Sequence, residues 1–173
     1  MDFVLAYPQA DIEVPLYMEM PRGVKCEGFE PREVVLALHK NLYGQKQAGR
    51  VWYQHLTRLL TMKHGFKQST VDECVFYRDG IMLLIYVDDT ICIYRDVGAA
   101  QKLAKELKKS FDITIEGTIT DFLGVQFKRR SDGSFALSQP QLIDSILRDL
   151  KLIDGKKKKA KPKRTPFKAN IIL

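Results

Sequence analysis

The chain has 173 residues, of which 45% are hydrophobic, so it can bury one good core but is short for two independent domains. Its net charge of +7 is concentrated near the C-terminus: residues 156–168 hold eight of the 28 Lys and Arg, which leaves 20 basic against 21 acidic residues elsewhere and excludes a basic surface over the whole body. Three scattered cysteines exclude a disulfide framework, no apolar run is long enough to span a bilayer, and we expect an intracellular, cytoplasmic protein.

The first half of the chain predicts a strand, a helix and a meander. The N-terminal segment is counted as a strand, and apolar residues at helical spacing predict a helix over residues 45–63 that ends around Gly65. Asp79-Gly80 is a strong hairpin signal, and Asp88-Asp89 interrupts the apolar run that follows it, so we place a turn at each pair. The antiparallel meander then has three strands, residues 74–77, 82–87 and 91–94.

The second half predicts a helix, a hairpin and another helix. Asp96 is a suitable N-cap for a helix whose apolar face reaches Phe111. Residues 123–128 and 134–137 predict a second hairpin, and Pro140 favours the first turn of a final helix.

These elements together predict an α+β fold in which helices pack on one face of an antiparallel sheet, followed by a C-terminal hairpin, helix and basic tail. Residues 1–150 would form the domain, and the Lys-rich residues 151–173 a disordered tail. The tail has the composition of a nuclear localisation signal or a nonspecific nucleic-acid-binding patch, and a simply solvated tail fits it equally well.

Two adjacent acids, Asp88 and Asp89, interrupt the apolar run from Ile85 to Ile91. A hairpin turn at this point would hold both carboxylates at its tip, where like charges repel unless a cation lies between them. Hard divalent cations such as Mg²⁺ take oxygen ligands and commonly use one or two carboxylates at sites that act on phosphates. The pair therefore indicates metal-assisted phosphoryl transfer, with an ordinary polar turn as the alternative.

Five segments, in the expected order, resemble a known family. Tyr86-Val87-Asp88-Asp89 resembles the catalytic motif of reverse transcriptases, and Leu42 to Tyr53 (LYGQKQAGRVWY) resembles a signature of the copia-type retrotransposon branch. Asp2 to Tyr7, Phe122 to Val125 and Leu137 to Gln139 resemble the segments that precede and follow the hairpin. The resemblance covers nearly the whole chain and implies a polymerase palm that performs RNA-directed DNA synthesis.

The resemblance also implies the roles of the acids. Asp2, Asp88 and Asp89 would be the catalytic carboxylates, with Asp2 and Asp88 as ligands of two Mg²⁺ ions, for which Mn²⁺ can substitute. Asp89 would support the metal site, and the backbone carbonyl of Phe3 would be a further ligand. Two metals can stabilise the attacking and leaving oxygens of nucleotidyl transfer to a primer 3′-hydroxyl. The implied partners are an RNA or DNA template with its primer and deoxynucleoside triphosphates.

Other residues match positions that contact the nucleotide in the family. Tyr7 would close the space of a ribose 2′-hydroxyl, although an ordinary strand aromatic is the alternative. Gly44 and Gln47 would contact template and incoming nucleotide, and the missing Cβ of Gly44 permits close backbone approach. Trp52 and Tyr53 are interpreted as helix core rather than as a base-stacking platform.

Three basic residues, Lys40, Lys46 and Arg50, are candidates for phosphate contacts because ammonium and guanidinium groups bind phosphate oxygens without reading sequence. The alternative is that all three are simply solvated. Two departures from the family pattern, Gln45 for an apolar residue and Gly49 for Pro, remove no catalytic group.

The chain starts one residue before its first predicted catalytic acid, Asp2. We therefore expect a palm fragment without fingers and thumb, completed by other parts of a retrotransposon polyprotein, in which Asp2 lies at a fraying terminus. Such a chain could be inactive. The alternatives are a noncatalytic remnant that binds nucleic acid through its basic tail, which could also direct nuclear entry, and a nonfunctional relic.

Overall fold

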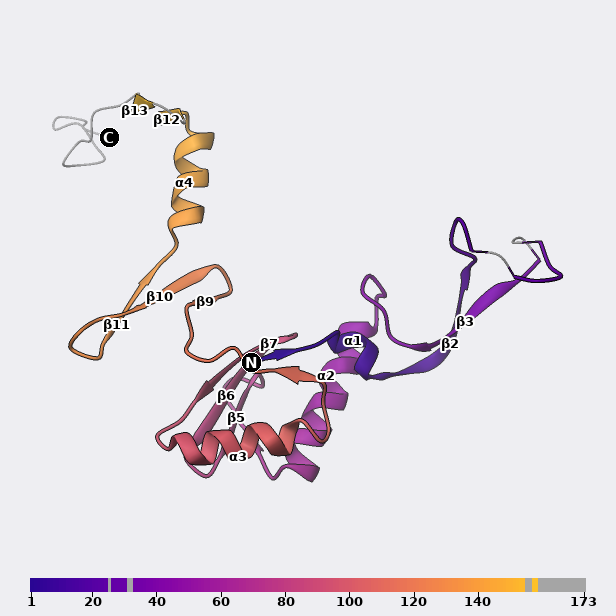
Figure 1. Cartoon of the computed structure of the whole chain (residues 1–173), viewed down its shortest axis with the longest axis horizontal. Helices are drawn as coiled ribbons and strands as arrows, with labels where there is room; N and C mark the ends of the chain where they lie inside the picture. The colour runs from indigo at the N-terminus through magenta and orange to yellow at the C-terminus, as the bar shows by residue number, and fades with distance from the viewer. Residues whose placement is uncertain (25, 31–32, 155–156, 159–173) are drawn as a thin grey trace, which may run out of the picture. The chain divides into compact units, whose positions relative to one another are not determined.

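The computed structural model describes residues 1–24, 26–30, 33–154 and 157–158. The chain divides into two compact units, unit 1 (Met1–Thr118) and unit 2 (Ile119–Leu173). Both are mixed α and β, and their paired strands are antiparallel (Figure 1). Within the described ranges, no helix has the length and apolarity needed to cross a membrane.

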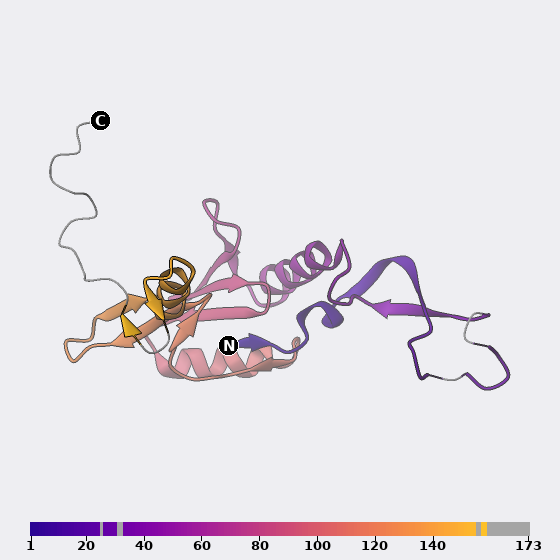
Figure 2. The same cartoon turned by 90° about the horizontal axis from the view of Figure 1, so that it is seen from above.

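Unit 1 is built around a six-stranded antiparallel sheet with the strand order β4-β5-β6-β7-β1-β8. A separate pair, β2 and β3, extends away from this sheet in both views (Figures 1 and 2). The elements of unit 1 are β1 (Asp2–Phe3), α1 (Ala6–Gln9), β2 (Asp11–Glu19), β3 (Val35–Lys40), α2 (Ala48–Arg58), the π-helical η1 (Leu59–Lys63), β4 (Lys67–Gln68), β5 (Val75–Arg78), β6 (Ile81–Tyr86), β7 (Asp89–Ile93), α3 (Val97–Leu107) and β8 (Ile113–Thr114).

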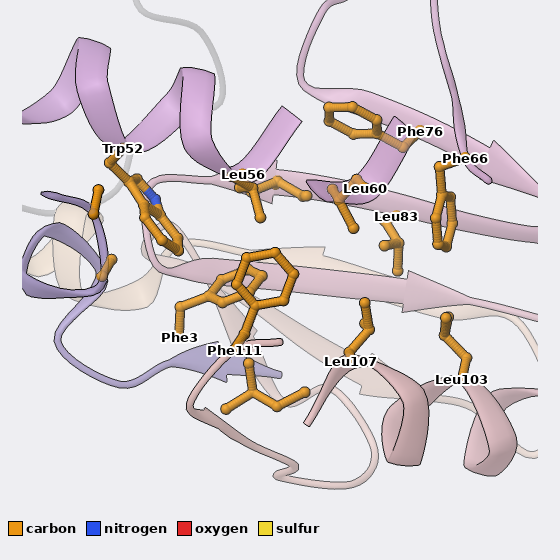
Figure 3. Packing of buried hydrophobic residues seen from close by; sticks show 14 of the residues in the cluster. Phe3, Trp52, Leu56, Leu60, Phe66, Phe76, Leu83, Leu103, Leu107 and Phe111 are labelled. Atoms are coloured by element: carbon orange, nitrogen blue, oxygen red, sulfur yellow. The ribbon is translucent and has the colours of Figure 1, made fainter. Parts of the chain in front are cut away.

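The hydrophobic core lies between the helices and one face of this sheet. Side chains alternate along β6, so that Ile81, Leu83 and Ile85 are buried while the residues between them are only partly buried. Figure 3 shows side chains of α2, η1 and α3 gathered around the buried side chain of Leu83. The sequence predicts this arrangement, in which helices pack on one face of an antiparallel sheet. The helical members of the core cluster are Ala6, Val51, Trp52, Leu56, Leu60, Leu103 and Leu107.

Strand β1 lies inside the sheet, between β7 and β8. The amide of Phe3 donates to the carbonyl of Asp88 at 3.0 Å, and the amide of Val4 donates to the carbonyl of Asp112 at 2.9 Å. The side chain of Phe3 is buried in the core. The expectation that Asp2 frays is therefore wrong, because hydrogen bonds on both sides fix the strand that contains it.

The hairpin between β6 and β7 has a different turn from the one predicted. Tyr86 pairs with Asp89, so the two turn residues are Val87 and Asp88. Placing the turn at Asp88-Asp89 was wrong by one residue, and Asp89 is the first residue of a strand instead of a tip residue. The sequence misled because Val is unfavourable at positive φ, yet Val87 has φ +58°.

Three local sequence signals elsewhere in unit 1 are confirmed, whereas α1 and the β2–β3 pair were not predicted. The helix predicted over residues 45–63 is α2 continued by η1, and Gly65 follows it with φ +67°. The carboxylate of Asp96 accepts a hydrogen bond from the amide of Gly98 at 2.8 Å, as an N-cap should. Asp79 and Gly80 form the turn between β5 and β6.

Unit 2 consists of a small three-stranded sheet in the order β11-β10-β9, one helix and a short strand pair. The predicted hairpin and the helix that starts at Pro140 are both present. No residue of that helix is buried, and Ile146 is 46% exposed. The basic tail lies mostly outside the described residues. The elements of unit 2 are β9 (Asp121–Phe122), β10 (Val125–Arg129), β11 (Phe135–Ser138), α4 (Pro140–Asp149), β12 (Ile153–Asp154) and β13 (Lys157–Lys158).

The burial of Leu60 and the exposure of Met62, both in η1, predict how substitution of each residue changes the stability of the fold. Leu60 is 0% exposed and Met62 is 83% exposed. We expect Leu60→Ala to lower the free energy of unfolding by about 2 to 5 kcal/mol, because it leaves a cavity in the core. Met62→Ala, the matched control, should change it by less than about 0.5 kcal/mol. Urea denaturation followed by circular dichroism measures both values, and equal effects would contradict the core assignment.

Candidate active site

The three predicted catalytic acids meet at the junction of β1 and the β6–β7 hairpin. Asp2 of β1 is the direct partner of Asp89 of β7. Asp88, the second residue of the β6–β7 turn, directly precedes Asp89. Directly opposite residues of an antiparallel pair point to the same face, and successive residues alternate. Because Phe3 points into the core, Asp2 and Asp89 lie on the sheet face opposite to the helices.

Backbone hydrogen bonds hold this junction in register. The amide of Phe3 donates to the carbonyl of Asp88 at 3.0 Å, and the amide of Thr90 donates to the carbonyl of Met1 at 2.9 Å. A third bond comes from α2, where the indole Nε1 of Trp52 donates to the carbonyl of Val87 at 2.8 Å. The backbone on both sides of the acids is therefore fixed independently of the carboxylates.

The carboxylates destabilise each other when they are all charged. Partial burial, followed by the negative charges of Asp88 and Asp89, raises the pKa of Asp2 above its usual range. Glu116 contributes in the same direction, and the sequence reasoning missed it because it lies on the segment after β8. Within the described ranges none of these acids forms an ion pair with a basic side chain.

The oxygen atoms at this site can supply some of the ligands of a hard divalent cation. Asp2, Asp88 and the carbonyl of Phe3 offer oxygen donors near one another in the pairing of β1 with β7. In the part of the chain that the structure describes, no group of three or more His, Cys, Asp or Glu side chains is arranged to hold one metal ion. Mg²⁺ is commonly bound by one or two carboxylates, with water and substrate phosphate completing the shell. The site therefore fits an ion shared with a phosphate ligand better than an ion enclosed by protein.

Tyr7 lies in α1 and not in a strand as the sequence analysis expected, beside a second aromatic residue, Tyr43, that the sequence analysis did not single out. The rings of Tyr7 and Tyr43 are 4.5 Å apart between centroids, with 36° between their planes. Partial burial, and after it the negative charge of Asp88, raises the pKa of the Tyr43 phenol. The pair thus lies next to the acids, and the position of Tyr43 directly before Gly44 in the quoted motif was the signal that could have identified it.

Gly44 and Gln47 lie in the segment that leads into α2. Gly44 has φ +91°, and a Cβ built there would meet no described atom within 4 Å. Its backbone conformation is therefore the feature that favours glycine within the chain. Gln47 is half-buried and precedes the first residue of α2 without capping it through its side chain. Nearby, the side chain of Gln45 accepts a hydrogen bond from the amide of Leu42 at 3.1 Å.

Two of the three predicted phosphate-binding residues contact acids of β2. Lys40 pairs with Asp11 at 2.6 Å, and Arg50 pairs with Glu13 at 2.5 Å. Lys46 is exposed and forms no ion pair with a described residue. These basic side chains therefore lie along the β2–β3 pair and the start of α2, and the structure does not bring them into contact with the acids of the hairpin.

Comparison with known proteins gives consistent matches. Residues 1–166 match the family model described as reverse transcriptase (RNA-dependent DNA polymerase). The chain is 33% identical over 179 residues to the Retrovirus-related Pol polyprotein from transposon TNT 1-94 of Nicotiana tabacum, an alignment that covers 100% of the chain and 13% of that protein. It is 31% identical over 135 residues to the Transposon Ty1-DR1 Gag-Pol polyprotein of Saccharomyces cerevisiae, covering 74% of the chain and 7% of that protein. No solved structure matches.

The raised pKa of Asp2 predicts a pH-dependent gain in stability for Asp2→Asn. A carboxyl with a raised pKa in the folded state stabilises the fold below the ordinary pKa of aspartate, about 3.9, and this contribution is lost as the pH rises through the folded value. At pH 7 the asparagine variant should therefore unfold at a higher temperature than the parent. The difference should vanish near pH 3, and scanning calorimetry at both pH values measures it.

Magnesium provides the control for this prediction. A cation held at the acids binds the folded state, so millimolar Mg²⁺ should raise the melting temperature of the parent at pH 7. The asparagine variant should respond less to Mg²⁺. A variant less stable than the parent at pH 7 would contradict the repulsion inferred at Asp2.

Proposed function

Because the chain belongs to the reverse transcriptase family of copia-type retrotransposon polyproteins, we propose that it is the palm-like part of an RNA-directed DNA polymerase. The observation that supports this most directly is the pairing of Asp2 with Asp89, which places the first acid beside the two acids of the hairpin. The segments are far apart in the sequence, and a polar turn has no need of a third carboxylate on the neighbouring strand.

The proposed reaction is in-line attack of a primer 3′-oxygen on the α-phosphate of a deoxynucleoside triphosphate. Two Mg²⁺ ions, when bound, would stabilise the negative charge on the attacking and leaving oxygens. Asp2, Asp88 and the carbonyl of Phe3 would hold these ions. Asp89, which is exposed on the same face as Asp2, would add negative charge to the site and orient its water.

The nucleotide would lie against the aromatic pair formed by Tyr7 and Tyr43. A ring at Tyr7 would leave no space for a ribose 2′-hydroxyl. The ring of Tyr43, whose centroid is 4.5 Å from that of Tyr7, would limit how far the Tyr7 ring can turn away. Gly44 and Gln47 would contact template and nucleotide through the segment between Tyr43 and α2. Lys40, Lys46 and Arg50 would bind backbone phosphates, and two of them would exchange an acidic partner for a phosphate.

The rest of the machinery would come from a longer protein. The chain spans 13% and 7% of the two relatives described above, which are a Pol and a Gag-Pol polyprotein. We therefore propose that other parts of such a polyprotein complete the binding site for template, primer and triphosphate.

A second candidate function is nucleic-acid binding without catalysis. Residues 156–168 hold eight Lys or Arg, enough to neutralise several phosphates or to direct nuclear entry. Most of this segment lies outside the described residues. Binding through it alone should weaken steeply with salt and should be lost when residues 156–173 are deleted, whereas binding at the acids should depend on Mg²⁺.

Primer extension tests the proposed polymerase. With an RNA template, a DNA primer and Mg²⁺, we expect Asp88→Asn to lower the extension rate by at least about 100-fold, because the variant loses a charged metal ligand. Asp144→Asn is the matched control, since Asp144 is an exposed acid of α4, and it should extend at the parental rate. The assay is run on the chain alone and on the chain joined to the flanking parts of its polyprotein.

Comparing the chain alone with the chain joined to its flanking parts distinguishes the two candidate functions. Extension that requires Asp88 in either form supports the polymerase. If neither form extends a primer, and RNA binding is lost on deletion of residues 156–173 but unaffected by Mg²⁺, the nucleic-acid binder replaces it.

Tyr7→Val tests the nucleotide site. A smaller side chain opens the space next to the sugar, so the preference for deoxynucleotides over ribonucleotides should fall by about 10- to 100-fold. The ratio of kcat/KM for the two nucleotides measures this preference. An unchanged ratio would show that Tyr7, a residue of α1, only packs against Tyr43.

A further inference from the structure

We propose that Trp52 is a positioning residue that holds the acids of the active site in place through its indole N–H. This inference rests on the proposed function, because it concerns the same carboxylates. The indole Nε1 donates a hydrogen bond of 2.8 Å to the carbonyl of Val87, the residue directly before Asp88. Trp52 is 2% exposed and lies at one end of the core cluster, beside Phe3 (Figure 3). A rigid buried side chain thus reaches the turn that bears the acid.

The turn needs such a contact because its sequence does not favour its conformation. Val87 has φ +58°, in the left-handed region that β-branched residues rarely adopt. Tight hairpins usually place Gly, Asn or Asp at such a position. A strained residue persists only where its surroundings hold it, and the carbonyl of Val87 is the point at which α2 holds this one.

Val87 is partly buried against the core, but the packing beside the turn is incomplete. A cavity of about 200 Å³ lies beside the hydrogen bond, and Tyr7, Gly49, Trp52, Tyr86 and Val87 contribute to its lining. The hairpin can move into this space if the hydrogen bond is lost. The bond from Trp52 is therefore a direct hydrogen-bonded link between α2 and the turn of the hairpin.

The same indole also contacts the strand that bears the first acid. The rings of Trp52 and Phe3 meet edge to face, with centroids 5.2 Å apart. Phe3 follows Asp2 in the sequence, and its amide donates to the carbonyl of Asp88 at 3.0 Å. Trp52 thus touches the neighbours of both acids, and through them fixes the distance between Asp2 and Asp88.

The competing explanation is that Trp52 only fills the core. The two explanations differ in one atom, since a core filler needs the shape of the indole and a positioning residue also needs its N–H. Trp52 is the single tryptophan of the chain, so growth of a tryptophan-requiring expression strain on an analogue replaces this residue alone. β-(3-Benzothienyl)alanine keeps the shape but has sulfur in place of N–H, and 7-azatryptophan keeps the N–H.

Amide hydrogen exchange in the full chain is the first readout, because it does not depend on catalysis. In the benzothienyl protein we expect the amides of Phe3 and Thr90, which bond across the β1–β7 junction, to exchange at least about 10-fold faster than in the parent. The amide of Phe66, which bonds to the carbonyl of Leu60 at 2.9 Å away from the hairpin, should exchange at the parental rate. The 7-azatryptophan protein should behave like the parent.

Magnesium titration and primer extension are the second readout. The benzothienyl protein should bind Mg²⁺ more weakly and show a kcat lowered by about 10- to 100-fold with little change in KM for the primer, since small displacements of catalytic groups have effects of this size. Asp88→Asn reports whether Mg²⁺ binds at the acids at all. A parent protein that does not bind Mg²⁺ would overturn the proposed function. Hydrogen exchange would still test the role of Trp52 in that case.

Equal exchange at Phe3 and Thr90 in the parent and benzothienyl proteins would overturn the positioning role. Faster exchange at Phe66 as well would also overturn it, because it would show that the analogue loosens the whole core. Faster exchange confined to the junction, restored by 7-azatryptophan, supports a donor that positions the acids.

Discussion

The burial of Phe3 is the constraint on which the site depends. Its ring packs against Trp52 and Phe111 in the core, and the centroid of each of these rings lies 5.2 Å from the centroid of Phe3. Because side chains alternate along a strand, Phe3 in the core places Asp2 on the opposite face, directly across from Asp89. A slip of one residue would exchange these positions and bury a carboxylate, so the hydrophobic effect and the cost of burying charge both favour one register.

The site itself works against the stability of the fold. Partial burial and then the neighbouring acids raise the pKa of Asp2, and Val87 adopts a conformation that its side chain disfavours. Backbone hydrogen bonds between β1 and β7 and the hydrogen bond from Trp52 offset both costs. Such a division between a strained, charged site and a packed support is common in proteins that bind cations and phosphates.

Unit 1 contains the three acids and all the residues proposed to contact the nucleotide. Unit 2 differs from unit 1 in how much of its apolar surface is buried. The helix α4 exposes Leu142, Ile143 and Ile146, although its apolar residues have helical spacing. An amphipathic helix forms part of a core only when another element covers its apolar face. The sequence could predict the helix and its first residue, Pro140, but not whether its apolar face is covered.

The sequence by itself predicted α2 with η1, α3, α4, the hairpin at Asp79-Gly80, the hairpin of β10 and β11 and the N-cap at Asp96, because these depend on spacing and turn residues within a few positions. It did not predict α1 or the β2–β3 pair. Only the tertiary structure decided that β1 lies between β7 and β8, that Val87 and Asp88 form the turn, and that Tyr43 stands beside Tyr7. It also decided which atom Trp52 reaches, since helical spacing identifies a core residue but not the partner of its N–H. These features depend on contacts between segments far apart in the chain, where packing and hydrogen bonding override the local preference of a residue such as Val87.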